Sequence, residues 1–271
     1  MSTIVLAHGL FGFGDLLPGF SLVNYFNGVR QELERNGHTV IVPTVNPIGS
    51  IKQRGAQLAK AILQDPKAVE GMHILAHSMG GLDARQALTN SDLARQIATL
   101  VTIGTPHRGS EVADAIVDST GPLFERIPSP LLKVLKKNAG AFEDLTTRIC
   151  IPFDDSTDDV DGVRYIEIAG DASQAPHELL LFDLAAMIGE IEGVNDGVVA
   201  RSSALRQVEG HEHLDDWPVD HLGEIGWGLD SPAPIVLKPP LPLFPAAKRH
   251  LARYDAIVTL INTTAKGAGA G

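Results

Sequence analysis

The chain has 271 residues, a length that fits two ordinary domains or one large α/β domain. Because 44% of the residues are hydrophobic, the chain can bury a sizeable core, which excludes an intrinsically disordered protein. Its 22 Lys and Arg against 33 Asp and Glu give a net charge of −11, which argues against nucleic-acid binding. The single cysteine, Cys150, excludes an intrachain disulfide and a multi-cysteine zinc site.

The first residues hold no basic segment followed by an apolar one, so the sequence predicts no signal peptide. No stretch of about 18 unbroken apolar residues occurs, so no transmembrane segment is predicted either. A cytoplasmic location is therefore the default expectation. A leaderless export route and a removed leader are the alternatives.

Short apolar runs alternate along the chain with longer helical patterns. Runs rich in β-branched residues predict strands, which are 3–7, 39–43, 72–76, 98–103, 163–169 and 204–208. Apolar residues at helical spacing predict helices at 24–36, 50–64, 81–90 and 246–262. Ser50 is the predicted N-cap of the second helix and Gly37 ends the first. This alternation is typical of a parallel sheet with helices on both faces.

The middle of the chain differs, because 111–147 holds no clear strand. Apolar residues recur there at spacings of three and four, while Pro128 and Pro130 break the stretch into short pieces. This pattern predicts a helical insertion. Its amphipathic piece 131–137 is either a small lid or an ordinary helix packed by its apolar face.

Two further segments have a biased composition. The run 154–159 (DDSTDD) is acidic and predicts a loop. The segment 231–245 holds six prolines, which predicts an extended chain. That segment either wraps its own domain or presents a polyproline helix to a partner.

The segment 76–81 (AHSMGG) carries the sharpest chemical signal. It lies between a predicted strand and a predicted helix, and small residues two before and two after Ser78 permit a strained tight turn. Such a turn puts the hydroxyl at the carboxyl edge of the sheet, beside a helix N-terminus that favours a developing anion. The sequence therefore predicts Ser78 as a nucleophile, with Ala76 in place of the usual first glycine.

The glycine-rich turn 8–12 (HGLFG) closes the first predicted strand. A turn of this kind can aim a backbone N–H at the substrate oxygen, and the residue after the serine supplies the second donor. We therefore predict an oxyanion hole made of the N–H groups of Leu10 and Met79.

A serine nucleophile also needs a base and an acid that orients the base. In hydrolases with a nucleophile elbow the chain order is serine, acid, histidine. Asp196 lies in a turn-forming Asn-Asp-Gly flanked by apolar residues, which favours it as the acid. Asp171, which follows a predicted strand, is the alternative.

The candidate bases downstream are His211, His213, His221 and His250. His221 is a polar residue among apolar ones, whereas His211 and His213 lie in an acidic stretch and are predicted to be solvated. His107 follows the fourth predicted strand and comes too early in the chain to be the base.

Six segments, taken in order, resemble the motifs of bacterial true lipases of the Pseudomonas–Burkholderia–Proteus type. They are HGLFG at 8–12, RGAQL at 54–58, AHSMGG at 76–81, TPHRGS at 105–110, NDG at 195–197 and DHL at 220–222. Six ordered motifs are far more specific than any one of them. The resemblance implies an α/β-hydrolase fold and hydrolysis of carboxylic esters through an acyl-enzyme.

The resemblance also implies a role for individual residues. By this resemblance, Ser78 is the nucleophile, Asp196 the acid and His221 the base. Leu10 and Met79 supply the oxyanion donors, and Arg54 anchors the oxyanion loop. Because nucleophile, acid and base are spread from 78 to 221, we expect one α/β domain over 1–271. The segment 110–147 would be its lid insertion.

The chain departs from these lipases in three respects. They commonly hold a structural calcium with an aspartate two residues after the catalytic histidine, where this chain has Gly223, so we expect no metal and no cofactor. Their common disulfide is impossible with one cysteine. The span from Ser110 to FEDL at 142–145 is shorter than a full lipase lid, which favours shorter or more soluble esters.

The expected function is that of an esterase or lipase, an enzyme of the serine hydrolase class. Its partner would be a small-molecule or lipid ester, with no nucleic acid involved and the oligomeric state left open. An acyltransferase on the same scaffold and a non-catalytic binding protein are the alternatives.

Overall fold

The residues that the computed structural model describes are 1–10, 25–127, 132, 136, 139–174, 182–227 and 249–267. Within them the chain forms one six-stranded sheet, and all neighbouring strands are parallel, in the order β2-β1-β3-β4-β5-β6. The strands are β1 Thr3–Ala7, β2 Thr39–Ile41, β3 Met72–His77, β4 Ile97–Ile103, β5 Arg164–Ile168 and β6 Glu212–His213.

The first five predicted strands are confirmed, with bounds within two residues of those expected. The prediction of a strand at 204–208 is wrong. Residues Arg201–Ala204 form the short helix α11, and Arg206 turns inward because its guanidinium donates to the buried Glu167 carboxylate at 3.0 Å. The sixth strand is instead β6, where Glu212 pairs with Ile166.

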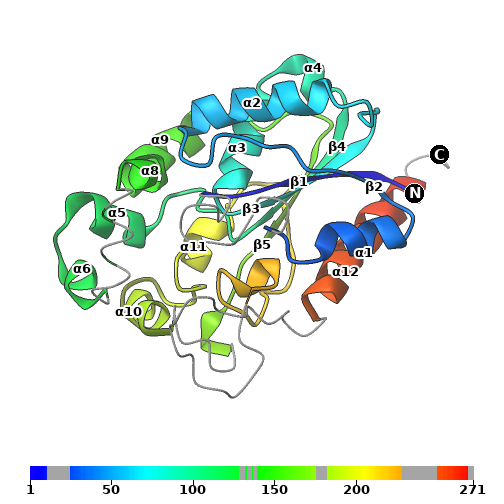
Figure 1. Cartoon of the computed structure of the whole chain (residues 1–271). Helices are drawn as coiled ribbons and strands as arrows, with labels where there is room; N and C mark the ends of the chain where they lie inside the picture. The colour runs from blue at the N-terminus through cyan, green and yellow to red at the C-terminus, as the bar shows by residue number, and fades with distance from the viewer. Residues whose placement is uncertain are drawn as a thin grey trace, which may run out of the picture.

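Helices cover both faces of the sheet (Figure 1). On one face α1 (Val29–Arg35) and α12 (Arg249–Gly267) pack against alternate residues of the central strands, Ile4 and Leu6 among them. On the other face α2 (Ile51–Leu63) and α3 (Met79–Leu88) pack against the residues between these, including Val5 and Ala7. Alternate side chains of a strand point to opposite faces, so the continuous apolar runs bury both.

The helix ends follow the predicted signals, but the predicted start of the first helix is wrong: residues 25–28 are not helical, because Gly28 has a left-handed φ of 75°, and α1 begins at Val29. Ser50 caps α2, since its hydroxyl accepts from the backbone N–H of Gln53, and Gly37 has a φ of 86° just after α1. α3 begins at Met79, two residues earlier than predicted, because Ser78 is itself its N-cap residue. No helix of the described chain is long and apolar enough to cross a membrane.

A group of short helices lies beyond the carboxyl ends of the strands (Figure 1). They are α5 Glu111–Asp118, α6 Pro122–Arg126, α8 Ala139–Phe142, the 3₁₀ turn η2 Glu143–Leu145 and α9 Thr147–Ser156. Their apolar residues, among them Leu123 and Phe142, share one core with Met79 and Leu82 of α3. The predicted helical insertion is therefore present, and it packs on α3, the helix that follows Ser78.

Two predictions for this part of the chain need comment. The acidic run 154–159 was expected to be a loop throughout, but α9 continues to Ser156. Of the piece 131–137 only Leu132 and Lys136 are described, and 231–245 lies outside the described residues.

A buried group of charged side chains, here named the ionic cluster, joins β5 to α3, α9 and the segment before β6. His211 Nδ1 lies 3.0 Å from Glu167 and its Nε2 lies 2.8 Å from Asp159. The prediction that His211 is solvated is wrong, since its side chain is only 4% exposed; His213 is exposed, as predicted. The members of the ionic cluster are Arg85, Asp154, Asp159, Glu167, Arg206 and His211.

Candidate active site

Ser78 occupies the turn between β3 and α3 with φ 56° and ψ −133°, a conformation that non-glycine residues rarely adopt. Neighbouring glycines make this turn possible. A Cβ on Gly80 would lie 2.5 Å from the carbonyl oxygen of Ala7, and one on Gly81 would lie 2.2 Å from Oγ1 of Thr105. Thr105 in turn donates its hydroxyl to the Ser78 carbonyl at 2.9 Å, a role that its motif alone did not reveal.

His221 and Asp196 complete a hydrogen-bonded series with Ser78. His221 Nε2 lies 2.9 Å from Ser78 Oγ, and His221 Nδ1 lies 2.7 Å from Asp196 Oδ2. The other carboxylate oxygen of Asp196 accepts from the N–H groups of Val198 and Val199 at 2.8 and 2.7 Å. Because Nδ1 donates its proton to Asp196, Nε2 keeps a lone pair for the serine proton, as general-base catalysis requires.

The alternative candidates lie in other contacts. Asp171 binds Ser173 and Gln174 instead of a histidine. His250 Nε2 lies 2.6 Å from the carbonyl oxygen of Asn27. His107 is fully buried, and its Nε2 lies 3.2 Å from the Thr102 hydroxyl. The structure therefore brings together the three residues predicted from the chain order and none of the alternatives.

The two predicted oxyanion donors flank Ser78. A Cβ on Gly9 would lie 2.8 Å from the Ser78 Cβ, so the turn after β1 passes directly against the nucleophile. Leu10 follows this glycine and is half-buried. Met79 is the first residue of α3, where a backbone N–H has no acceptor within the helix. Both residues therefore lie where their N–H groups can face a substrate oxygen.

Arg54 of α2 donates hydrogen bonds to the turn after β1, residues 8–10, which is here named the oxyanion turn because it carries Leu10. Its side chain is fully buried, and its Nη2 donates to the carbonyl oxygens of His8 and Gly9 at 2.9 and 3.1 Å. Nη1 donates to the carbonyl oxygen of Asn46, and Nε donates to Asp83 of α3. Burial raises the pKa of the Asp83 carboxyl, and the Arg54 charge opposes this rise. The geometry matches the anchoring role that the resemblance implied for Arg54.

Three buried polar residues beside the triad, here named the polar relay, were not predicted. Tyr25 Oη lies 2.7 Å from His77 Nδ1, and His77 Nε2 lies 3.0 Å from Glu224 Oε2. Glu224 Oε2 is also 3.5 Å from Nδ1 of His221. Burial and the neighbouring His221 lower the pKa of His77 well below its usual value, so this imidazole is neutral. Sequence reasoning missed Glu224 because the residues after His221 form no recognisable motif. Its place in the site depends on its contact with His77, which is distant in the sequence.

The calcium of the resembled lipases does not fit the residues found here. Hard cations need several oxygen ligands. The position two after His221 is Gly223, and a Cβ there would lie 2.9 Å from the Cβ of Val219. Within the described chain, one group of three potential metal ligands occurs, and it consists of His77, His221 and Glu224, two imidazoles and one carboxyl already bonded inside the site.

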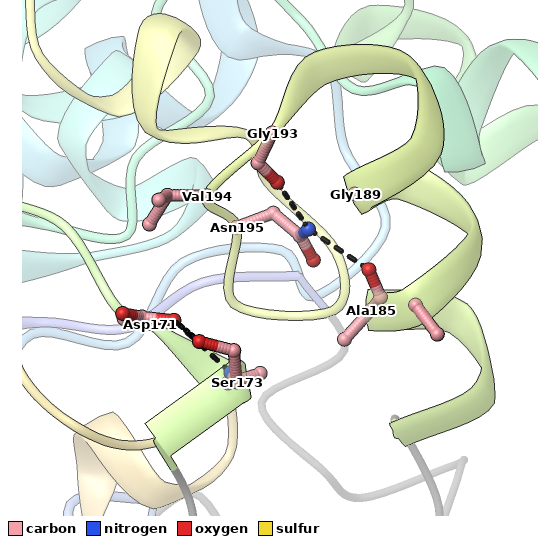
Figure 2. Close-up of a pocket in the computed structure, with 9 residues that line it drawn as sticks. Asp171, Ser173, Ala185, Gly189, Gly193, Val194 and Asn195 are labelled. Atoms are coloured by element: carbon pink, nitrogen blue, oxygen red, sulfur yellow. Dashed lines mark hydrogen bonds between the residues drawn. The ribbon is translucent and has the colours of Figure 1, made fainter.

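A cavity of about 420 Å³ lies beside the loop that carries Asp196, between α10 (Phe182–Glu192) and the 3₁₀ turn η3 (Ala172–Gln174). Figure 2 shows Asn195 at its wall, with its amide nitrogen donating to the carbonyl oxygens of Ala185 and Gly193, both at 2.9 Å. Asn195 therefore ties α10 to the acid loop. The residues lining the cavity are Asp171, Ala172, Ser173, Ala185, Ala186, Gly189, Gly193, Val194 and Asn195.

A parallel sheet with a strained serine between strand and helix, and with acid and histidine on later loops, defines an α/β-hydrolase. Solved structures agree on the fold. The mature form of a Bacillus licheniformis lipase gives a TM-score of 0.66 at 23% identity, covering 83% of this chain and 86% of that one. A metagenomic carboxyl esterase gives 0.70 at 19% identity, covering 97% and 76%.

Sequence relatives specify the family. The PGAP1-like alpha/beta domain profile matches residues 53–174. Triacylglycerol lipase 2 of Saccharomyces cerevisiae is 32% identical over 214 residues, 76% of this chain and 63% of that protein. The triacylglycerol lipase of Vibrio cholerae is 30% identical over 259 residues, 82% of this chain and 78% of that protein. The chain thus belongs to the triacylglycerol lipase family, although it spans less than two thirds of the yeast relative.

Proposed function

We propose that the protein hydrolyses carboxylic esters of lipids through an acyl-enzyme on Ser78. The observation that carries this proposal is the series from Ser78 through His221 to Asp196, with distances of 2.9 and 2.7 Å. The names of the Saccharomyces and Vibrio relatives support a lipid ester as substrate. The six ordered motifs support a lipase of the Pseudomonas–Burkholderia–Proteus type.

The proposed reaction has two halves. His221 takes the Ser78 proton as the serine oxygen attacks the ester carbonyl, and the carboxylate of Asp196 stabilises the imidazolium that forms. The N–H groups of Leu10 and Met79 bind the oxyanion. His221 gives its proton to the leaving alcohol, and it then activates a water molecule that releases the acyl group.

We further propose that the segment 110–147 acts as the lid of this site within one α/β domain. Its helices α5 and α6 share a core with Met79, and α10 packs beside them. Ser78 is only 7% exposed. Under this proposal, movement of the segment admits the ester to Ser78, which is a conformational step that can set the rate.

The serine assignment is tested with Ser78→Ala. We expect kcat for p-nitrophenyl esters to fall by about 10³- to 10⁶-fold, because the nucleophile is lost. Ser202→Ala, which changes an exposed serine of α11, is the matched control and should keep wild-type activity. A fluorophosphonate should label the wild type and the control but not Ser78→Ala. Near-wild-type turnover by Ser78→Ala would overturn the proposal.

The substrate class is tested by initial rates over esters from acetate to long-chain triglyceride, with and without an oil–water interface. Turnover of triglyceride supports a lipase. If only short soluble esters are hydrolysed, the substrate is a small soluble ester and not a lipid ester, as the short lid insertion favours.

A further inference from the structure

Two carboxyl groups approach the same side of the catalytic imidazole. Asp196 Oδ2 lies 2.7 Å from Nδ1 of His221 and Glu224 Oε2 lies 3.5 Å from it. Asp196 is 1% exposed and Glu224 is 0% exposed. Two buried carboxylates within 3.5 Å of the same imidazole nitrogen repel each other, so both are not ionised together.

Hydrogen bonds decide which of the two carries the charge. Asp196 accepts from two backbone N–H groups and from His221, three donors that favour its ionised form. Glu224 faces one N–H, that of His77, which is shared with the carbonyl oxygen of His221. Its Oε1 has no hydrogen-bond partner within the described chain. Burial and then the charges of Asp196 and Asp220 raise the pKa of Glu224 well above its usual value, while the Arg253 charge opposes the rise, in agreement with this assignment.

The backbone leaves space for this carboxyl at two strand ends. A Cβ on Gly104, just after β4, would lie 2.1 Å from Glu224 Oε2. A Cβ on Gly170, beyond β5, would lie 2.7 Å from Glu224 Oε1. Any larger residue at either position would displace the carboxyl, so these glycines are part of its site.

The polar relay connects Glu224 to the oxyanion turn. The neutral His77 accepts from the Tyr25 hydroxyl at Nδ1 and donates from Nε2 to Glu224 and to the His221 carbonyl. The Tyr25 hydroxyl lies 2.6 Å from the position of a Cβ on Gly9. Side-chain contacts therefore connect the turn at Gly9, through Tyr25 and His77, to the segment that carries His221.

We propose that Glu224 is a positioning residue that stays a neutral carboxylic acid and, through His77 and Tyr25, fixes His221 relative to the oxyanion turn. The proposal rests on the function proposed above. A neutral group can hold His221 in place without adding a second negative charge beside the imidazolium. A second carboxylate would hold the proton on His221 and slow its transfer to the leaving alcohol.

The decisive variant is Glu224→Gln, which has nearly the same shape and is neutral at every pH. Because the amide oxygen of Gln can accept the same hydrogen bond from His77, we expect kcat to stay within about 3-fold of the wild type, and the apparent pKa of the acid limb of the kcat/KM profile to stay within about 0.3 units of it. An ionised Glu224 predicts a different result. Removing its charge would lower the acid-limb pKa by about one unit, and that shift would overturn the proposal.

Two further measurements separate positioning from folding. Tyr25→Phe breaks the far end of the relay and should lower kcat about 3- to 10-fold with KM nearly unchanged. An infrared spectrum of the wild type at pH 7 should contain a protonated-carboxyl C=O band that Glu224→Gln lacks and the exposed control Glu209→Gln keeps. Absence of this band from the wild type would also overturn the proposal.

A failure of the proposed function can be distinguished from a failure of the proposal about Glu224. Fluorophosphonate labelling of Glu224→Gln at Ser78 reports whether the protein is a serine hydrolase, whatever the state of Glu224. If the label attaches and the acid limb shifts, the enzyme assignment holds and only the neutral carboxyl is refuted.

Discussion

The protein contains two buried polar networks. One is the triad with its polar relay, the other is the ionic cluster, and they offset the free-energy cost of burying polar groups in different ways. In the ionic cluster three carboxylates face two guanidiniums and His211. Both ring nitrogens of His211 lie near carboxylates, which only accept hydrogen bonds, and these bonds raise the pKa of the imidazole. With His211 protonated, the six named side chains carry three charges of each sign.

The polar relay avoids charge instead. His77 is neutral and Tyr25 is un-ionised, since burial raises its pKa. A site that must create an imidazolium in each turnover uses one carboxylate, Asp196, to stabilise it, whereas a second fixed carboxylate would hold the proton on His221. A cluster that only joins elements gains from permanent ion pairs with complete hydrogen bonding. The comparison predicts that variants of one network change kcat and variants of the other change stability.

The largest effect is expected from Asp196→Asn. The amide cannot hold the tautomer of His221 that leaves Nε2 free, so kcat should fall by about 10⁴-fold. The urea concentration at the midpoint of unfolding should stay close to that of the wild type. If Asp196→Asn unfolded at a much lower urea concentration but kept its kcat, the expectation that variants of the triad change kcat rather than stability would be wrong.

Glu167→Gln tests the other network. Arg206 and His211 lose their shared carboxylate, and breaking one partner out of a buried ion pair costs about 3–5 kcal/mol of unfolding free energy. The folded fraction should keep its kcat. The double variant Glu167→Leu with Arg206→Met removes both charges and should be less destabilised than the single one, as measured by urea unfolding.

Arg54 stands between the two cases, because it forms a buried ion pair with Asp83 and also holds the oxyanion turn. Arg54→Lys keeps the charge but loses the planar fork that binds several carbonyl oxygens. We expect kcat to fall about 10- to 100-fold through misplaced oxyanion donors. Lys52→Arg, at an exposed position of α2, is the control for expression and handling. If Arg54→Lys kept the wild-type kcat, the oxyanion turn would not depend on the hydrogen bonds of the Arg54 guanidinium.

The pH dependence of stability distinguishes the networks further. Burial lowers the pKa of His211, but hydrogen bonds to Asp159 and Glu167 outweigh it, and the net pKa is raised. The stabilisation from His211 is therefore complete below its unfolded pKa and is lost as pH rises through the folded value. Unfolding free energy measured from pH 6 to pH 9 should fall more in the wild type than in His211→Gln. Parallel curves would contradict the charged imidazole.

The smallest effect is expected from Ala76→Gly, which restores the residue usual before a nucleophile elbow. Ala76 is fully buried in β3, so the glycine loses one methyl group and gains backbone freedom. We expect a loss of about 1 kcal/mol in unfolding free energy and little change in kcat. A large gain in kcat would show that the alanine restricts the turn.

Much of the fold could be predicted because its signals are local. Continuous β-branched runs such as 3–7 mark strands buried on both faces, and small residues around Ser78 mark the elbow. The two-residue strand β6 could not be predicted, since its neighbour β5 and not its own sequence makes it a strand. His211 was misjudged because its partners Glu167 and Asp159 lie more than forty residues away.

The edges of the sheet bear on how the molecule behaves at high concentration. In the part of the chain that the structure describes, the edge strands β2 and β6 have only three and two residues, so each offers few unpaired backbone groups to another sheet. Long, flat edge strands are what template association between chains. With a net charge of −11, neighbouring molecules also repel one another. Concentrated solutions should therefore resist edge-to-edge aggregation, and lengthening either edge strand would be the quickest way to lose that resistance.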